Sequence, residues 1–335
     1  MRVSRTEFLR VLESVSPGLS PREVTEQSSC FVFDQGRVLT FNDEVCASRV
    51  SPVPDLVGAV SAKPLMLLLD KLPEDEIDIT AGDGEVYVKG TGRRAGITME
   101  NEIRSAGGSV EKPGDWKPLD PDFGAAVGVV ADCCSRNEEM FVLTCVHIAP
   151  DFLEACDNSQ VIRYPIKTDV GQDVLIRQAS LRSIRGLDMT EFSETEGWFH
   201  FRNPAGLVIS CRRWVDTYPD LSDFMVDEEA KPLTLPAGLA EAVGKAEVFS
   251  SLNSETPNVV VDIQPGKLLL EGRGAVGWYQ EKKTIVYNGR PLRFSIAPKL
   301  LVDVLKRSND CKISASRLIV ETGKYRFVSC LAEVG

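Results

Sequence analysis

Phe294-Ser295-Ile296-Ala297-Pro298 opens the stretch that decides the fold: a strand, then a proline start, then an apolar helix marked by Leu300 and Leu301. The same order of elements occurs earlier at Val60-Ser61-Ala62-Lys63-Pro64, before Leu65 to Leu72, and at Val174-Leu175-Ile176, before Leu181 to Leu187. A second type of helix recurs with it, over residues 5–15, 122–136 and 236–248. The period is about 115 to 120 residues, roughly a third of the chain. The sequence therefore predicts three tandem domains with two helices each, over residues 1–117, 118–227 and 228–335.

Short runs with strand character lie between the helices, and tight-turn signals join many of them. The runs are 30–33, 37–41, 85–89, 199–202, 207–211, 259–263, 267–271 and 325–330, and the turns are Asp34-Gln35-Gly36, Gly82-Asp83-Gly84, Asn203-Pro204-Ala205-Gly206 and Gln264-Pro265-Gly266. Polar, proline-bearing stretches at 112–116 and 218–224 mark the domain boundaries, and Trp116 and Phe224 are expected to fix these linkers to a sheet. Antiparallel sheets with two helices per domain predict an α+β fold.

The composition argues against several classes of protein. The 335 residues carry 38 Lys and Arg against 49 Asp and Glu, a net charge of −11, and no apolar run is long enough to span a bilayer. Nine cysteines without a Cys-x-x-Cys pair and only two histidines, His147 and His200, argue against a disulfide framework, a zinc site and histidine-based catalysis. No signal-peptide pattern follows Met1. We expect a cytoplasmic protein without a metal ion or cofactor.

Positive charge is concentrated on the helices in spite of the acidic balance. On each of the six expected helices the apolar residues share one face, and at least one basic residue lies on the opposite face. Solvated helix faces often carry Lys and Arg, but a basic face on all six, in an acidic chain, suggests one basic surface made by helices and one acidic surface made by sheets. With Arg22 in the loop after the first helix, the candidate nucleic-acid-facing residues are Arg10, Arg22, Lys63, Lys71, Arg136, Arg177, Arg182, Arg185, Lys245, Lys299 and Lys306.

Several stretches resemble a known family, the bacterial-type DNA sliding clamp, which is the beta subunit of DNA polymerase III. The first helix at 5–15, the strand, turn and strand at 33–40, and the helix at 60–79 with its closing Leu72-Pro73 are similar to the family's first domain. Asp115-Trp116 and Tyr218-Pro219-Asp220 resemble its domain-ending motifs, and the last third, with 294–306 ahead of Cys311-Lys312-Ile313, is the most similar part. The chain is short for the family, as expected of a divergent or phage-encoded member.

The resemblance implies a fold and a function. In such clamps each domain places two helices against a central hole and sheets outside, and two chains close head-to-tail into a ring. The ring encircles double-stranded DNA without reading its sequence, so it needs only a weakly positive lining against the phosphates. It tethers the polymerase and the clamp loader through short peptide motifs. A non-enzymatic processivity factor, active as a homodimer, is the implied function.

The resemblance also implies two contact sites in this chain. A partner-peptide cleft is expected at Val161, Ile162, Pro232, Val328 and Leu331, where the family's Gly-His-Arg-Leu-like turn is replaced by Asp157-Asn158-Ser159-Gln160 and its Met-Pro-containing end by 328–333. These apolar residues are otherwise interpreted as core. The dimer contact is expected where the strand 93–99, with Ala95, Ile97 and Met99, pairs with the third domain of another chain near Val248 and Phe249.

Other functions remain open from the residues themselves. An enzyme would need a nucleophile or a carboxylate pair in a pocket, and Asp43-Glu44 and Glu138-Glu139 are typical loop acids. Gly90-Thr91-Gly92-Arg93-Arg94 is expected to form a hairpin turn rather than a phosphate loop. A sequence-specific DNA binder would need a recognition helix, whereas the basic residues are spread one or two per helix. A clamp-fold protein that binds DNA or a polymerase without closing into a ring is the main alternative.

Overall fold

The structure is a computed structural model that describes residues 1–252 and 256–334, and its chain forms two compact units. Unit 1 comprises Met1–Asp132, Cys145–Asp151 and Ile166–Asp216, and unit 2 comprises Cys133–Thr144, Phe152–Pro165 and the described residues from Thr217 onward. Residues 118–227 contribute to both units. The division into three domains therefore stays a prediction. No helix among the described residues is long and apolar enough to cross a membrane.

The first two helices of unit 1 form as the sequence predicts. Helix α1 spans Arg5–Val15, and the Ser4 hydroxyl accepts a hydrogen bond from the Glu7 backbone N–H at 3.3 Å, which satisfies one free donor at the start of the helix. Phe8 and Leu12 on α1 are fully buried. Helix α2 spans Ala62–Lys71 and packs beside α1. The apolar periodicity and the start of these helices therefore suffice to place them.

The second pair of helices in unit 1 is shorter than expected. Helix α3 covers Phe123–Val130 and passes into a 3-10 turn at Ala131–Cys133, so the expected helix to residue 136 is wrong. Helix α4 covers only Gln178–Arg182. After α4 the chain continues in tight turns, in which a backbone N–H donates to the carbonyl three residues earlier. Gly186 has a positive φ of 75°, a conformation that ends a right-handed helix.

Unit 1 is organised by one long antiparallel sheet, with the strand order β1-β6-β7-β8-β5-β2-β3-β4-β16-β15-β14-β9. Its strands are β1 Arg2–Ser4, β2 Cys30–Asp34, β3 Arg37–Phe41, β4 Val45–Val50, β5 Gly58–Ser61, β6 Glu76–Gly82, β7 Glu85–Gly90, β8 Arg93–Glu100, β9 Lys117–Pro118, β14 Glu191–Glu194, β15 Trp198–Arg202 and β16 Val208–Arg212. Strands β10 Cys145–Ala149 and β13 Val174–Arg177 also belong to this unit and pair antiparallel with each other. The pairing of β4 with β16 continues the sheet from the predicted first domain into the predicted second one.

The expected hairpin turns are present. Gln35 and Gly36 between β2 and β3, and Asp83 and Gly84 between β6 and β7, all have positive φ, as a two-residue turn of this hand requires. The glycine-rich stretch at 90–94 joins β7 to β8 as a hairpin, which confirms that it is not a phosphate loop.

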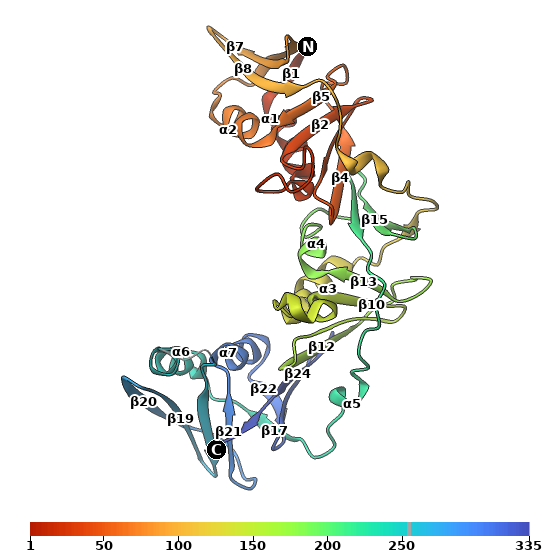
Figure 1. Ribbon diagram of the computed structural model, residues 1–335. Helices are drawn as coiled ribbons and strands as arrows, with labels where there is room; N and C mark the ends of the chain where they lie inside the picture. The colour runs from red at the N-terminus through yellow and green to blue at the C-terminus, as the bar shows by residue number, and fades with distance from the viewer. Residues whose placement is uncertain (253–255, 335) are drawn as a thin grey trace. The chain divides into compact units, whose positions relative to one another are not determined.

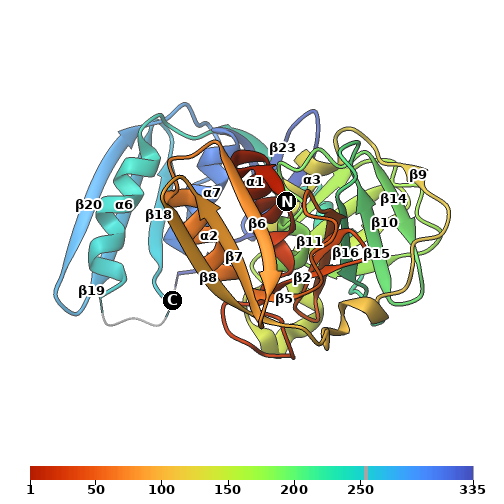
Figure 2. The same ribbon diagram turned by 90° about the horizontal axis from the view of Figure 1, so that it is seen from above.

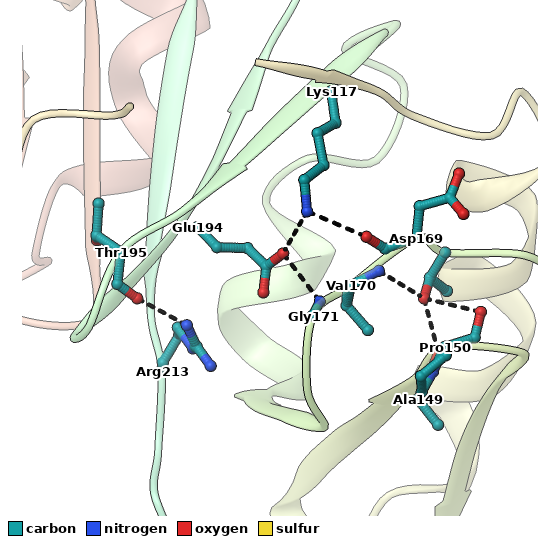
Figure 3. A network of polar contacts seen from close by, with 10 residues as sticks. Lys117, Ala149, Pro150, Asp169, Val170, Gly171, Glu194, Thr195 and Arg213 are labelled. Carbon is teal, nitrogen blue, oxygen red and sulfur yellow. Dashed lines mark hydrogen bonds and ion pairs between the residues drawn. The ribbon is translucent and has the colours of Figure 1, made fainter. Parts of the chain in front are cut away.

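The linker at 112–118 is fixed to the sheet, as predicted from its tryptophan. The Arg202 guanidinium on β15 lies 4.3 Å from the centre of the Trp116 ring. Figure 3 shows the polar contacts beside it, in which Lys117 Nζ donates to the Asp169 carbonyl and to Glu194 Oε1, both at 3.2 Å. The Gly171 N–H donates to the same carboxylate oxygen at 3.3 Å. The linker is therefore part of the folded unit rather than a free tether.

Unit 2 contains two antiparallel sheets and three helices. One sheet has the order β11-β12-β24-β23-β22-β17 and the other β20-β19-β18-β21-β25. The elements are β11 Phe152–Cys156, β12 Gln160–Pro165, β17 Lys231–Thr234, β18 Val259–Gln264, β19 Lys267–Gly274, β20 Gly277–Thr284, β21 Leu292–Ile296, β22 Asp310–Ile313, β23 Arg317–Glu321, β24 Arg326–Cys330, β25 Ala332–Glu333, α5 Ser222–Met225, α6 Leu239–Ser250 and α7 Pro298–Arg307. Helices α6 and α7 lie side by side (Figure 1), and α6 crosses β18 and β19 (Figure 2).

Two glycines in this part of unit 2 give a matched stability test. A Cβ on Gly272 of β19 would collide with the Ala246 carbonyl of α6, whereas a Cβ on Gly244 of α6 would meet nothing within 4 Å. We expect Gly272→Ala to lower the free energy of unfolding by about 1–3 kcal/mol through overpacking. Gly244→Ala should raise it by about 0.5–1 kcal/mol, because alanine loses less backbone entropy in a helix. Denaturant unfolding of unit 2 measures both, and equal midpoints would contradict the close packing.

Candidate nucleic-acid surface and peptide groove

The basic residues predicted on the helices are solvent-exposed with one exception. Arg10 on α1, Lys63 and Lys71 on α2, Lys245 on α6, and Lys299 and Lys306 on α7 all lie on exposed positions of their helices, and Arg22 is exposed in the loop before β2. Their helices turn apolar residues such as Leu65, Val243 and Leu301 into the core. The opposition of an apolar and a basic face is therefore a property of these helices in the folded chain.

Helix α3 departs from this pattern, because its eight residues include no basic side chain and Arg136 lies beyond its end. The Arg185 guanidinium, from the turn after α4, instead supplies a positive charge beside α3. Its Nε lies 3.7 Å from the position that a Cβ would occupy on Gly128 of α3. This is an ordinary van der Waals distance, so the guanidinium lies against α3 at Gly128. Positive charge thus reaches α3 from the neighbouring segment rather than from its own sequence.

The candidate basic residues differ in whether an acid neutralises them. Four take part in ion pairs: Arg177 with Glu44 at 3.5 Å, Arg182 with Asp132 at 2.7 Å, Lys245 with Glu241 at 2.9 Å, and Lys306 with Asp303 at 3.2 Å. The others form no ion pair with a described residue: Arg10, Arg22, Lys63, Lys71, Arg136, Arg185 and Lys299. Half-buried Arg177 is the exception to exposure. The unpaired residues are the ones whose full charge is available to a phosphate.

On the strands, many basic residues form ion pairs with acids. Many arginines and lysines on strands are paired with a carboxylate on the same strand, on the next strand or, for Arg212, in the turn before β4: Arg2 with Glu76, Arg163 with Glu154, Arg202 with Glu191, Arg212 with Asp43, Arg273 with Glu271, Lys283 with Glu281, and Lys312 and Arg326 with Glu321. Cross-strand pairs of this kind cancel much of the local field. Other basic residues on strands, such as Lys89 and Arg293, are exposed and form no ion pair with a described residue, so uncompensated positive charge lies on both the helices and the sheets.

Unit 2 contains an apolar groove of about 240 Å³. It is lined by Leu143, Cys156, Asn158, Gln160, Val161, Pro219, Leu221, Phe224 and Cys330. Beneath it, Val161 and Leu221 pack with Met225, Ile319 and Val328 in one buried cluster. The groove is thus an opening onto the core of unit 2, in which apolar side chains are accessible at the surface.

The linker wall of the groove is held by hydrogen bonds to its backbone. Arg317 Nη1 donates to the carbonyls of Asp223, Phe224 and Val226 at 3.0, 3.4 and 2.6 Å, which satisfies the end of the short helix α5. The Arg317 guanidinium also lies 5.5 Å from the centre of the Phe224 ring. Phe224 is 45% exposed although it lines the groove. The predicted anchoring of this linker by Phe224 is confirmed, and the ring keeps a free face.

The opposite wall is the turn between β11 and β12. The Asp157 carboxylate accepts hydrogen bonds from the backbone N–H groups of Ser159 and Gln160 and from the Gln160 side chain, at 3.0, 3.1 and 2.8 Å. Asn158 has a positive φ of 74°, which asparagine tolerates. Behind this turn, the Cys156 N–H donates to the Tyr218 hydroxyl at 3.1 Å. Both walls are therefore held by hydrogen bonds within the unit.

The structure brings only part of the predicted cleft together. Val161 lines the groove, whereas Ile162 and Val328 are buried in the core and Leu331 is nearly so. Pro232 is exposed on β17 and does not line it. The sequence reading missed Leu143, Cys156, Leu221 and Cys330. Two apolar residues inside the polar linker, Leu221 and Phe224, were the sequence feature that could have indicated the groove.

The residues predicted for a dimer contact lie on two separate elements. In β8, Ile97 and Met99 are buried in the chain's own core and Ala95 is half-buried. Strand β8 pairs with β7 along its length, but with β5 only at Met99 and Glu100. Val248 is exposed at the end of α6, and the ring of half-buried Phe249 lies beside Gly277 of β20, an edge strand of its sheet. A contact through β8 would therefore use backbone groups of residues 93–98.

The histidines take part in internal contacts. His200 is fully buried, with its Nδ1 2.7 Å from Ser210 Oγ and its Nε2 3.1 Å from Thr195 Oγ1, and burial lowers its pKa to about 4. His147 is also buried, 3.0 Å from Asp173. Asp43 and Glu44 are ion-paired with arginines. Within residues 1–252 and 256–334, no three His, Cys, Asp or Glu side chains are placed to hold a metal ion.

Comparison with known proteins identifies the fold. No family model and no curated protein matches the chain. Solved structures do: the DNA polymerase III subunit beta of Pseudomonas aeruginosa matches at 15% identity over 100% of both chains, with a TM-score of 0.84. The beta chain of Streptococcus pneumoniae matches at 17% identity over 99% of both chains, with a TM-score of 0.83. The DNA polymerase sliding clamp of Bacillus subtilis matches at 14% identity over 100% of this chain and 99% of its own, with a TM-score of 0.81.

These similarities show that the chain has the fold of the DNA sliding clamp over its whole length. The α+β clamp fold expected from the sequence is confirmed. The low identity makes it a divergent version of that fold.

Cysteine chemistry offers a test of the groove. Eight of the nine cysteines are buried, and Cys330, on the groove wall, is half-buried. We expect iodoacetamide to modify Cys330 first in the native protein. Burial raises the pKa of this thiol, so the labelling rate should be low at neutral pH and rise about tenfold per pH unit below that pKa. Peptide mapping by mass spectrometry measures it, with Cys330→Ser as the control. Equal labelling of Cys133 would contradict the open groove.

Proposed function

We propose that the protein is a DNA sliding clamp, a non-catalytic processivity factor that encircles double-stranded DNA as a head-to-tail dimer and tethers a polymerase. The observation that carries the proposal is the charge distribution on a clamp fold. Exposed basic residues that form no ion pair with a described residue lie on α1, α2 and α7 and in the turn after α4, whereas many basic residues on the sheets are neutralised by acids. A sliding protein needs weak, sequence-independent attraction to phosphates, and single lysines and arginines spread over several helices supply it.

Ring closure is supported by two strand edges. The outer edge of β8 at residues 93–98 has no strand partner among the described residues, and β20 ends the five-stranded sheet of unit 2. Exposed apolar residues lie on or beside β20: Val248 in the last turn of α6, Leu252 just after α6, Val276 in the turn before the strand and Trp278 on β20 itself. An edge of this kind invites pairing with another chain. Pairing of β8 with β20 of a second copy, repeated twice, would close a two-fold ring.

The groove of unit 2 is the proposed tethering site. Its volume and its exposed Phe224 suit one or two Leu-sized or Phe-sized anchors of a short extended peptide from a polymerase or a clamp loader. So small a contact is expected to bind in the micromolar range. We place this activity in the cytoplasm, where a replication factor meets DNA.

DNA contact is tested by reversing four unpaired charges on or beside the helices. In the variant Arg10→Glu, Lys63→Glu, Arg185→Glu and Lys299→Glu, we expect DNA affinity to fall at least about tenfold and its salt dependence to flatten. These side chains face away from the core, so the melting temperature should hold. The control variant, Lys89→Glu, Lys112→Glu, Arg290→Glu and Arg293→Glu, makes the same change in net charge off the helices. Fluorescence anisotropy on duplex DNA between 50 and 200 mM salt measures the DNA affinity of both variants. Equal losses of affinity would contradict the proposal that the helices form the DNA-binding surface.

Ring formation is tested through Val248, which is 55% exposed beside β20. Light scattering should give twice the chain mass of 36.8 kDa at micromolar concentration. Val248→Asp should shift the protein toward monomer, because it places a charge in the proposed contact. Val215→Asp, at a residue 96% exposed, is the matched control.

The same preparations distinguish a closed ring from the alternative of an open clamp-fold protein. Loaded wild-type protein should stay on circular DNA and leave when the circle is cut. Retention that survives cutting would favour binding to one face of DNA without closure.

A further inference from the structure

The groove of unit 2 is bordered by acidic residues. The linker segment 218–230 contains Asp220, Asp223, Asp227, Glu228 and Glu229 and no Lys or Arg. Pro219, Leu221 and Phe224 from this segment line the groove, while Asp220 and Asp223 between them are exposed. The apolar floor and the acidic rim therefore come from alternating residues of one stretch of chain.

The opposite wall adds to the negative charge. Asp157 is half-buried in the turn beside Asn158. Burial raises the pKa of the groove thiols of Cys156 and Cys330, and the negative charge of Asp157 is a smaller effect in the same direction. Both walls of the groove therefore carry carboxylates.

Nearby basic residues only partly offset these acids. Arg163 is paired with Glu154 at 2.8 Å. Arg317 Nη1 donates to the linker carbonyls, and the Arg317 charge acts to lower the pKa of the Cys330 thiol against the larger raising effect of burial, so Arg317 offsets part of the negative charge at the groove. The Ser222 N–H donates to the Asp220 carboxylate at 2.9 Å and holds the pKa of Asp220 below its usual range, which keeps it charged at neutral pH. The rim is net negative.

We propose that the groove selects partner segments in which the apolar anchors are flanked by Lys or Arg, and disfavours segments with acidic flanks. The inference rests on the proposed tethering function, since it assigns a charge preference to that same groove. The apolar floor supplies affinity through burial, and the rim supplies selectivity and a faster encounter. A nucleic acid is the wrong occupant, because its phosphates would face the same carboxylates.

The test uses three peptides with one core, Ser-Leu-Ser-Leu-Phe, flanked on each side by two lysines, two serines or two glutamates. Fluorescence anisotropy with the full-length protein should rank them lysine, serine, glutamate, with lysine about tenfold tighter than glutamate at 50 mM salt. At 300 mM salt this ratio should fall to about twofold, because screening weakens exposed charges. A scrambled, anchor-free core with lysine flanks is the control for non-specific attraction.

Variants locate the charge preference on the rim. Asp220→Asn with Asp223→Asn should reduce the lysine-to-glutamate ratio about threefold or more and leave the serine-flanked peptide unchanged. Asparagine can still accept the Ser222 hydrogen bond, so the linker should keep its fold. Asp262→Asn with Glu247→Gln removes the same charge from β18 and α6 and should leave the ratio intact.

The possible results separate the inference from the proposed function. Equal binding of all three flanked peptides, with loss of binding when the core is scrambled, would keep the groove as a tether and overturn the charge preference. Binding of the scrambled lysine peptide as tightly as the intact one would also overturn it, as attraction without the groove. No binding of any core-containing peptide would overturn the tethering function and the inference together.

Discussion

Two strand pairings hold the chain together across its predicted domains. Strand β4 pairs with β16 from Val45 to Ser48, and β12 pairs with β24 from Gln160 to Arg163. In each case the hydrogen bonds run between backbone groups, so they constrain register without prescribing which side chains face outward. The remaining features depend on this constraint. Because the paired strands connect the chain segments within each unit, the exposed helix faces can carry basic residues without weakening that connection.

The difference between strands and helices also bears on where positive charge lies in an acidic chain. On strands, a basic residue lies beside cross-strand neighbours and finds a carboxylate, as Arg202 finds Glu191 at 2.7 Å. On a helix, an outer basic residue can pair with an acid three or four positions away, as Lys245 does with Glu241 and Lys306 with Asp303. Lys63 and Lys299 form no ion pair with a described residue. Geometry, more than composition, decides where the field is positive.

Much of the fold is legible in the sequence because it depends on local patterns. The apolar spacing of residues 5–15 predicts both ends of α1 correctly. The dipeptides at 35–36 and 83–84 predict hairpins because their residues adopt the positive φ that a two-residue turn needs. The early end of α4 depends on turn geometry that a run of periodic leucines and isoleucines conceals. The groove was only partly predictable, because its walls combine residues near 143, 156–161, 219–224 and 330. Ion pairs such as Arg182 with Asp132 also join distant segments, so the sequence could not show which charges remain free.

The pairing of β12 with β24 also sets an order of events during synthesis. Val161 and its cross-strand partner Val328 are separated by about half of the printed sequence, and Cys330 completes the wall two residues later. A ribosome adding roughly 5–20 residues per second needs on the order of ten to thirty seconds to cover that interval. During this time β12 has an open edge and the groove has no second wall. A chain still on the ribosome therefore has no complete groove until synthesis has passed residue 330.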